Sequence, residues 1–238
     1  MKRFGNKKYY IPVIFLLSIF IVLAVYHEGT EEKSREISYY ITKEKGSCAS
    51  ENEKEAYVKH HIIQKDDMRT VFSEIWDDGR GSLTYVFIGK AVRYMFNEKG
   101  ELTNKTILDF GDYGGYIWWG SYILLAKEVE VGDMWEGDVT IKSQNMEDQS
   151  PVVTQIVLHC RAEVLSCEKI KVKAGDFKCY KIKLTQEGEY KDNNENRSVK
   201  YTITLWYSPD LKIILKDTQR SLFGDFECTS TSELVEYR

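Results

Sequence analysis

The histidines and cysteines of this chain lack the spacings that catalysis or metal binding requires. His60 and His61 are adjacent, so on a β-strand their side chains face opposite sides, and His159 stands alone beside Cys160. Neither an HExxH motif nor a CxxC pair occurs, so we expect no metal site and no cofactor. A Cys160 nucleophile would need a distant histidine positioned as its base, and the sequence gives no sign of such an arrangement.

Pairs of aspartates offer another chemistry, because two carboxyl groups can share the work of glycoside hydrolysis. Asp77 and Asp78 form one such pair, and Asp109 and Asp112 form another. Both pairs stand next to glycines, and aspartate beside glycine is typical of turns. We therefore expect no catalytic residues and a non-enzymatic protein.

An aromatic cluster is the feature that most favours ligand contact. Trp118 and Trp119 must face opposite ways on a strand, so at most one of them lies in the core of a one-sided sheet. Exposed rings can stack on a sugar or line an acyl-chain cavity, whereas a strand buried on both faces would use them as core. The candidate ligand-binding residues are Tyr116, Trp118, Trp119 and Tyr122.

The N-terminus carries an apolar segment, residues 9–26, without a charged side chain. The basic residues of the segment 1–8 precede it, and Glu28 is the first acidic residue after it. Basic flanks remain in the cytoplasm, so residues 1–8 should be a cytoplasmic tail and the rest of the chain should lie outside. The segment fits both a transmembrane anchor and a cleaved signal. We favour the anchor, which places the protein in the cell membrane; cleavage would make it a secreted protein.

The part outside the membrane is acidic. It holds all 37 acidic residues and, because four basic residues precede residue 9, 29 of the 33 basic ones, which gives a formal charge of −8. An acidic surface disfavours nucleic acid as a partner. The partners we expect are the membrane, through residues 9–26, and a lipid or another envelope component.

Five cysteines lie in this outer part of the chain. An oxidising compartment favours one or two disulfides, and the odd number leaves at least one cysteine unpaired. Cys160 and Cys167 are close enough in sequence to face each other across a hairpin, which makes them candidates for a disulfide. Small buried thiols are an equally good interpretation.

Alternating apolar and polar residues predict β-strands after residue 56. Residues 27–55, rich in Glu, Lys and Ser, are interpreted as a juxtamembrane linker, so residues 56–238 form the extracytoplasmic domain. Gly89-Lys90 and the segment 97–100 have the composition of hairpin turns. The last third lacks a helical stripe, so its strands should pair antiparallel. Strands are expected in this third over 153–161, 164–172, 177–185, 200–207, 212–220 and 226–237.

Three segments resemble the signatures of a known family. They are Val131–Trp135, Lys171–Ile182 and Leu205–Leu211, which are similar to the VGDxW, VxVxAGxFxCYKI and WYSPxLG patterns of uncharacterised secreted bacterial proteins of the TapB-like kind. Lys212 departs from the pattern, because the family usually has glycine there. The resemblance covers about residues 124–220. It implies a curved antiparallel sheet similar to the half-barrel of LolA/LppX-like lipoprotein carriers, which encloses apolar ligands, and it transfers no catalytic residues.

The second signature also has a structural explanation. Ala174-Gly175 permits a tight turn between two strands. The residues expected to supply the inward layer are Ile170, Val172, Tyr180, Ile182 and Leu184.

The expected fold is therefore mainly β, with one large curved antiparallel sheet after an N-terminal membrane-spanning helix. The expected function is a non-enzymatic envelope protein that binds a lipid-like or other amphipathic ligand in that sheet. The alternative is a surface-tethered structural or protein-interaction module with no small ligand. A hydrolase would require His159 or His61 to meet a carboxylate or thiol in a cleft.

Overall fold

A computed structural model describes most of the chain from residue 39 onward. The described residues are 39–48, 53–65, 69–87, 89–110, 116–119, 122–125, 129–146, 153–192 and 195–238. They belong to one compact unit, Ile37–Arg238. The apolar segment 9–26 lies outside the described residues, so the anchor stays a prediction.

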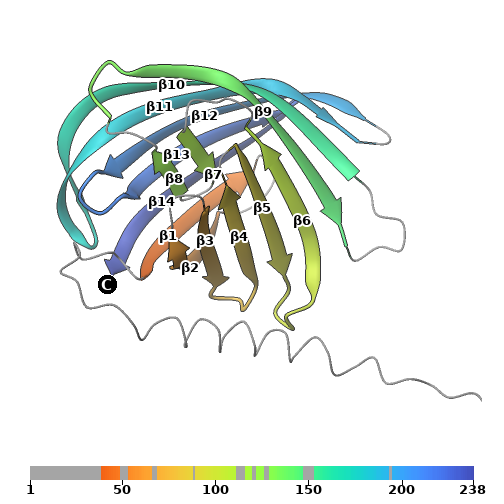
Figure 1. Cartoon of the computed structure of the whole chain (residues 1–238), viewed down its shortest axis with the longest axis horizontal. Helices are drawn as coiled ribbons and strands as arrows, with labels where there is room; N and C mark the ends of the chain where they lie inside the picture. The colour runs from red at the N-terminus through yellow and green to blue at the C-terminus, as the bar shows by residue number, and fades with distance from the viewer. Residues whose placement is uncertain are drawn as a thin grey trace, which may run out of the picture. The chain divides into compact units, whose positions relative to one another are not determined.

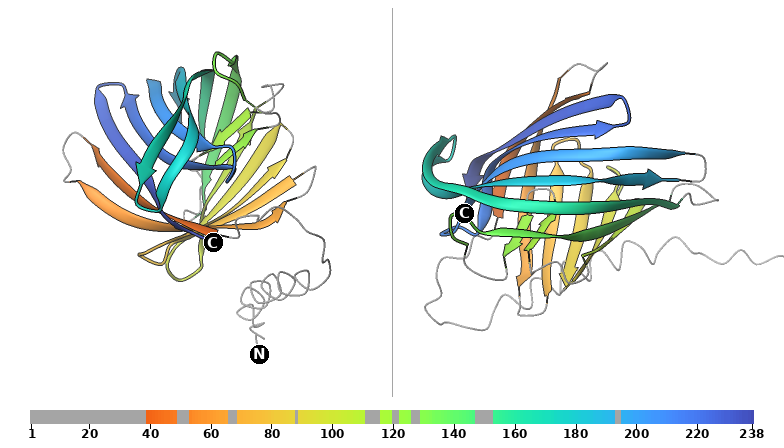
Figure 2. Two further views of the ribbon diagram at one scale, coloured as in Figure 1. Left: turned by 90° about the vertical axis from the view of Figure 1, so that its left-hand side faces the viewer. Right: turned by 90° about the horizontal axis from the view of Figure 1, so that it is seen from above.

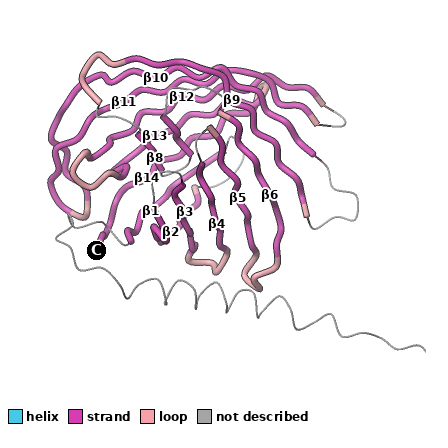
Figure 3. The backbone as a smooth tube through the Cα atoms, in the orientation of Figure 1, coloured by secondary structure: helices cyan, strands magenta, loops and turns pink. Residues whose placement is uncertain are grey.

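The described residues form fourteen strands and no helix. Figure 3 accordingly colours them only as strand and loop. None of them builds a helix with the length and hydropathy that crossing a bilayer demands. The strands are β1 (Tyr39–Cys48), β2 (Lys54–Lys65), β3 (Arg69–Trp76), β4 (Gly81–Phe87), β5 (Lys90–Phe96), β6 (Leu102–Asp109), β7 (Tyr116–Trp119), β8 (Tyr122–Leu125), β9 (Met134–Asn145), β10 (Val153–Val172), β11 (Gly175–Lys191), β12 (Asn196–Ser208), β13 (Ile213–Phe223) and β14 (Phe226–Tyr237).

Twelve of these strands close into an antiparallel barrel, in the order β1-β14-β13-β12-β11-β10-β9-β6-β5-β4-β3-β2 (Figures 1 and 2). The expected antiparallel sheet is confirmed, but its two edges meet, so it is a closed barrel and not an open half-barrel. The strand that closes it is β1, which pairs with β2 on one side and β14 on the other. Since β1 lies inside residues 27–55, the interpretation of that whole range as a linker was wrong.

The hairpin turns form where the sequence predicts them. Gly89 and Gly100 have φ angles of 72° and 75°, a conformation that glycine adopts without a Cβ clash. Lys212 adopts a φ of 56° in the turn between β12 and β13, and it is the only non-glycine residue with a positive φ among those described. The position where the resembled family has glycine is therefore one where glycine is conformationally favoured.

Strand β10 runs unbroken through both of the segments expected as separate strands. A β-bulge interrupts its pairing with β11 between Val164 and Ser166. Cys160 and Cys167 thus lie on one strand, where seven residues span about 23 Å, and both are free thiols. The candidate disulfide between Cys160 and Cys167 is therefore not formed, and the bond lies instead between Cys48 on β1 and Cys228 on β14, which face each other across the seam.

The bulge also changes which face of the β10–β11 hairpin is buried. Before it, Val164 pairs with Ile182 on the inner face; after it, Val172 and Cys179 are buried on the opposite face. Ile182 and Leu184 therefore belong to the inward layer as expected, but Val172 does not.

Beyond the bulge, the hairpin tip folds back over the outer side of β12–β14, at the end of the barrel where Figure 2 shows it curling. The Trp206 indole N–H donates to Glu168 Oε1 at 2.7 Å. The Lys173 backbone N–H donates to Glu233 Oε1 at 3.0 Å, and the Phe177 ring packs edge-on to Tyr237. These contacts bury Cys179 completely.

The two remaining strands, β7 and β8, form a separate hairpin. It leaves the barrel wall between β6 and β9, yet β8 lies against β13, well around the barrel from that point (Figure 1). The hairpin therefore reaches across the ring of strands to another part of the wall.

Candidate functional site

A buried histidine is the centre of a polar network inside the barrel. His60 on β2 is fully buried, and its Nε2 lies 2.8 Å from the Thr42 hydroxyl on β1. Its Nδ1 lies 3.5 Å from Glu74 Oε1 on β3. The Tyr40 ring stacks on the imidazole with a centroid separation of 4.5 Å. These contacts hold the imidazole in one orientation.

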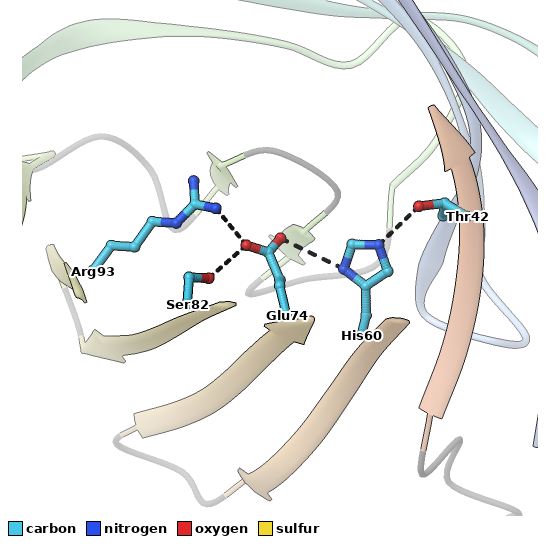
Figure 4. A network of polar contacts seen from close by, with 5 residues as sticks. All are labelled: Thr42, His60, Glu74, Ser82 and Arg93. Atoms are coloured by element: carbon cyan, nitrogen blue, oxygen red, sulfur yellow. Dashed lines mark hydrogen bonds and ion pairs between the residues drawn. The ribbon is translucent and has the colours of Figure 1, made fainter. Parts of the chain in front are cut away.

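Glu74 connects this histidine to the next strands of the barrel (Figure 4). Its Oε2 accepts hydrogen bonds from the Ser82 hydroxyl at 2.7 Å and from Arg93 Nη2 at 2.5 Å. The Arg93 guanidinium also lies over the Trp76 ring, 5.6 Å from its centroid. Arg93 therefore has an ionic and an aromatic partner.

The pKa of Glu74 reflects these contacts. Burial by itself would raise this pKa. The hydrogen bonds from His60 and Ser82 and the electrostatic attraction of Arg93 and His60 outweigh burial and lower the pKa to about 2. Glu74 is thus a carboxylate throughout the physiological pH range.

Strand register explains why these side chains meet. His60 pairs with Glu74, and Glu74 pairs with Ser82, so the three lie in one row across β2, β3 and β4. Directly opposed residues of antiparallel strands point to the same face. The row faces the barrel interior because its members are buried while their sequence neighbours are more exposed.

A second polar cluster continues the row on β6 and β9. Thr106 lies opposite Arg93 in register, and its hydroxyl donates to Asn104 Oδ1 at 3.0 Å. The Ser143 hydroxyl donates to the same oxygen at 2.9 Å. The polar surface therefore extends from β1 to β9 along the inside of the barrel.

A pair of carboxyl groups lies on the other side of His60. Glu44 on β1 is opposite Ser232 on β14, and Ser232 is opposite Asp217 on β13. Burial and the negative charge of Glu44 raise the pKa of Asp217 to about 7, against a hydrogen bond from Ser232. Burial also raises the pKa of Glu44, partly offset by His60 and Arg93. Asp217 is therefore partly protonated at neutral pH.

The opposite part of the wall is apolar. All the buried polar side chains of the described residues except Ser208 come from β1–β4, β6, β13 and β14. Strands β9–β12 contribute buried aliphatic side chains and one thiol to the inner face: Val139, Leu158, Cys160, Ala162, Val164, Ile182, Leu184, Val199, Ile203 and Leu205. We call these residues the apolar wall, and Thr42, Glu44, His60, Glu74, Ser82, Thr84, Arg93, Thr106, Asp217 and Ser232 the polar wall.

The sequence-predicted aromatic residues lie on the two strands outside the barrel order. Tyr116, Trp118, Trp119 and Tyr122 belong to the β7–β8 hairpin, in which Trp119 pairs with Tyr122. Their side chains lie outside the described residues, so ligand contact by these four stays a prediction.

The chemical groupings considered for a hydrolase are also separated. His159 Nδ1 lies 2.9 Å from Asp138 Oδ1, but both side chains are exposed on the outer face. Cys160 points inward, away from His159, and burial raises the pKa of its thiol to about 12. A thiol with this pKa is a poor nucleophile at neutral pH.

Sequence reasoning missed the polar wall, although a signal was present. Glu74 lies two residues from both Phe72 and Trp76, so it shares their face on a strand. Arg93 is placed in the same way between Ala91 and Met95. Charged residues in the parity of apolar ones indicate charges on an inward face. The arrangement can bind and orient a polar group.

Comparison with known proteins finds similarity at the level of structure and none at the level of sequence family. No protein-family model and no curated protein matches the chain, so the TapB-like resemblance rests on its short motifs. Three crystal structures are similar in fold. A "putative lipoprotein" from Parabacteroides distasonis has a TM-score of 0.44 at 12% identity, covering 86% of this chain and 96% of its own. A "putative exported protein with YmcC-like fold" from Bacteroides fragilis has a TM-score of 0.43 at 13% identity, covering 86% and 97%. The hypothetical lipoprotein YmcC from Escherichia coli has a TM-score of 0.36 at 9% identity, covering 92% and 97%.

Proposed function

We propose that this chain is a non-enzymatic binding protein that holds a lipid-like or other amphipathic ligand inside its barrel. The observation that carries the proposal is the uneven distribution of buried polar side chains: they concentrate on β1–β4, β6, β13 and β14, among apolar residues such as Tyr40, Phe72 and Leu108, whereas the inner face of β9–β12 buries mainly apolar side chains. An amphipathic molecule between these two regions would place its chain against aliphatic side chains and its polar group against hydrogen-bonding ones. Both parts of such a ligand would then be compatible with burial.

The size of the barrel supports the same proposal. An eight-stranded barrel is just wide enough for its own side chains to fill, and width grows with strand number. This barrel has twelve strands. Several inward-facing side chains on the apolar side are only partly buried, including Ile141, Ile156 and Tyr201. These residues are where we expect the apolar part of a ligand to add contacts.

The β7–β8 hairpin adds a second candidate contact region. Because β8 lies against β13, the hairpin spans the inside of the barrel, where the ligand would bind. We retain Tyr116, Trp118, Trp119 and Tyr122 as proposed ligand contacts on this basis.

The proposed location is outside the cytoplasm, at the cell membrane. The charge asymmetry around residues 9–26 supports this orientation. The Cys48–Cys228 disulfide supports it independently, because such bonds persist in oxidising compartments.

Native mass spectrometry of the full-length chain, released from mild detergent, tests the proposal. We expect bound molecules of lipid mass on the folded protein. The variant Ile156→Trp should reduce their occupancy, because it fills space on the inner face. Val157→Trp is the matched control, since Val157 is the next residue of β10 and is 40% exposed on the outer face. A folded protein that carries and takes up no lipid of any class would support the interaction-module alternative.

A further inference from the structure

The tip of the β10–β11 hairpin has two faces of opposite character. This tip, residues 165–181, is the part beyond the bulge that folds back over the outer side of β12–β14 (Figure 2). The face that packs on the barrel consists of Ile170, Val172, Phe177 and Cys179. The residues that alternate with them therefore face solvent.

Lysines dominate this solvent face. Lys169 and Lys171 alternate along β10, and Lys178 lies directly opposite Lys169 in register. Lys173 follows in the turn between the two strands. All four side chains are exposed, and of the two acidic residues of the tip only Asp176 lies on this face. We call the four lysines the basic tip.

The charge of the tip is opposite to that of the chain around it. Residues 165–181 contain five lysines and two acidic residues, so their formal charge is 5 − 2 = +3. The chain after residue 8 carries −8 in total. Positive charge is therefore concentrated in one short hairpin.

The lysines of the basic tip have no ion pair. No carboxylate pairs with any of the four ammonium groups within the part of the chain that the structure describes. Like charges directly opposite each other, as in Lys169 and Lys178, destabilise a pair of strands. A negatively charged partner would relieve this repulsion.

Basic residues at the other end of the same strands are paired. The ion pairs there are Glu187–Lys200, Glu189–Lys191, Glu195–Arg197 and Glu227–Arg220. These basic side chains are exposed as well, so exposure alone does not explain why the basic tip lacks acidic partners. The difference favours a partner from outside the chain at the tip.

Exposed apolar side chains adjoin the tip. The Gly132 backbone N–H donates to the Val164 carbonyl at 2.9 Å, which holds the loop before β9 beside the point where the tip leaves the barrel. Val131 and Met134 flank this contact, Leu165 lies at the bulge, and the three are 56%, 61% and 40% exposed. Apolar area beside positive charge strengthens binding to the interface of an anionic membrane.

The chain enters the barrel at this same end. The Tyr39 backbone N–H donates to the Arg238 carbonyl, and the Tyr237 ring packs against Phe177 of the tip. Twelve residues, 27–38, separate Tyr39 from the apolar N-terminal segment, and twelve residues reach at most about 40 Å. An anchor in a membrane would therefore keep this end of the barrel close to the lipid surface.

We infer that the basic tip binds the anionic head groups of the membrane to which the chain is anchored. This inference rests on the proposed location and is independent of the ligand proposed for the interior. Lysines near an anionic lipid surface are attracted to it within a Debye length, about 8–10 Å at moderate salt. Docking of the tip would fix the orientation of the barrel relative to the bilayer.

Fluorescence quenching on the full-length chain in vesicles tests the inference. Cys167 is exposed on the same face as Lys169, whereas the other free thiols, Cys160 and Cys179, are buried, so a maleimide dye marks the tip without a substitution. The vesicles contain phosphatidylcholine alone or mixed with phosphatidylglycerol, and both carry a lipid with a nitroxide on its head group. We expect several-fold stronger quenching with phosphatidylglycerol. Raising salt from about 0.1 M to about 1 M should remove the difference, because the Debye length falls from about 10 Å to about 3 Å.

Two triple variants separate the tip from general charge effects. The tip variant replaces three lysines of the basic tip: Lys169→Gln, Lys171→Gln and Lys178→Gln. The matched control removes three positive charges from the other end of the strands: Lys191→Gln, Arg197→Gln and Lys200→Gln. The tip variant should lower quenching with phosphatidylglycerol to the level of phosphatidylcholine alone, and the control should leave it unchanged.

Three results would count against the account, each in a different place. Equal quenching in the two kinds of vesicle, or equal behaviour of the two triple variants, would overturn the inference. A dye response to soluble polyphosphate with none to phosphatidylglycerol would overturn the membrane as the partner of the tip. Failure of the full-length chain to float with phosphatidylcholine vesicles would instead overturn the proposed location.

Discussion

Arg93 on β5 donates a hydrogen bond to Glu74 on β3, across the intervening strand β4. Both side chains are nearly buried, so each charge depends on the other. Removing Arg93 leaves Glu74 with His60 and Ser82 as its polar partners, and the loss of one member of a buried ion pair costs about 3–5 kcal/mol.

Arg93→Met should therefore lower the free energy of unfolding by several kcal/mol, measured by urea denaturation. The matched control is Arg80→Met, because Arg80 forms an ion pair of 2.7 Å with Asp78 on the surface. Exposed pairs contribute about 0–1 kcal/mol. Similar losses for the two variants would show that the interior pair is not electrostatically isolated from water.

Asp217 gives the protein a pH-dependent stability of unusual sign. Its pKa of about 7 in the folded protein is higher than the usual value of an aspartate, so between these two values the folded state binds more protons than the unfolded state. The contribution of Asp217 therefore falls as pH rises from about 4 to 7, by at most about 1.4 kcal/mol per pH unit.

Asp217→Asn removes this dependence, so the variant should gain stability relative to the parent as pH rises through this window. Urea midpoints of the two proteins at pH 4.5, 6 and 8 measure the difference. Parallel curves would mean that Asp217 does not titrate differently in the two states. Glu74 acts at lower pH: its depressed pKa stabilises the protein above the unfolded value and loses that effect as pH falls toward 2.

The Cys48–Cys228 disulfide should contribute strongly to stability, because it joins residues 180 apart in sequence and closes the barrel at its seam. Cys228→Ser should lower the free energy of unfolding by about 2–5 kcal/mol. Cys167→Ser, which removes an exposed free thiol, should change it little. Urea denaturation of both variants, with and without reductant, checks this, and insensitivity of the parent protein to reductant would contradict it.

Lys212→Gly should stabilise the protein by about 1 kcal/mol, because a φ of 56° is unfavourable for a residue with a Cβ atom. Asp210→Gly, in the same turn but without a positive φ, should destabilise it slightly through chain entropy. Thermal unfolding midpoints of the two variants distinguish the effects. A lower midpoint for Lys212→Gly would mean that the lysine side chain contributes contacts that outweigh the backbone strain.

Local sequence signals predicted the strands and turns well. The strand expected over 226–237 is β14 itself, and Gly89 and Gly100 lie in the turns that their positions indicate. These features depend on residues near one another in sequence. The bulge after Val164 was invisible to this reasoning, because alternation continues on both sides of it and only the pairing shifts.

Features that depend on distant pairing could not be predicted in the same way. Barrel closure requires β1 to pair with β14, which brings Cys48 opposite Cys228. Nothing in the polar sequence of β1 indicates β14 as its partner strand. The polar wall likewise forms only when His60, Glu74 and Arg93 come into register on separate strands.

Photo-crosslinking with a diazirine-bearing long-chain amphiphile tests the central claim most directly, because alternate residues of one strand face opposite sides of the wall. Mass spectrometry of the labelled full-length chain should find adducts on the inward residues Ile156 and Leu158 of β10 and Ile203 and Leu205 of β12. Adducts confined to outward residues such as Val157 and Thr204, or labelling that excess unlabelled amphiphile fails to compete away, would contradict ligand binding inside the barrel.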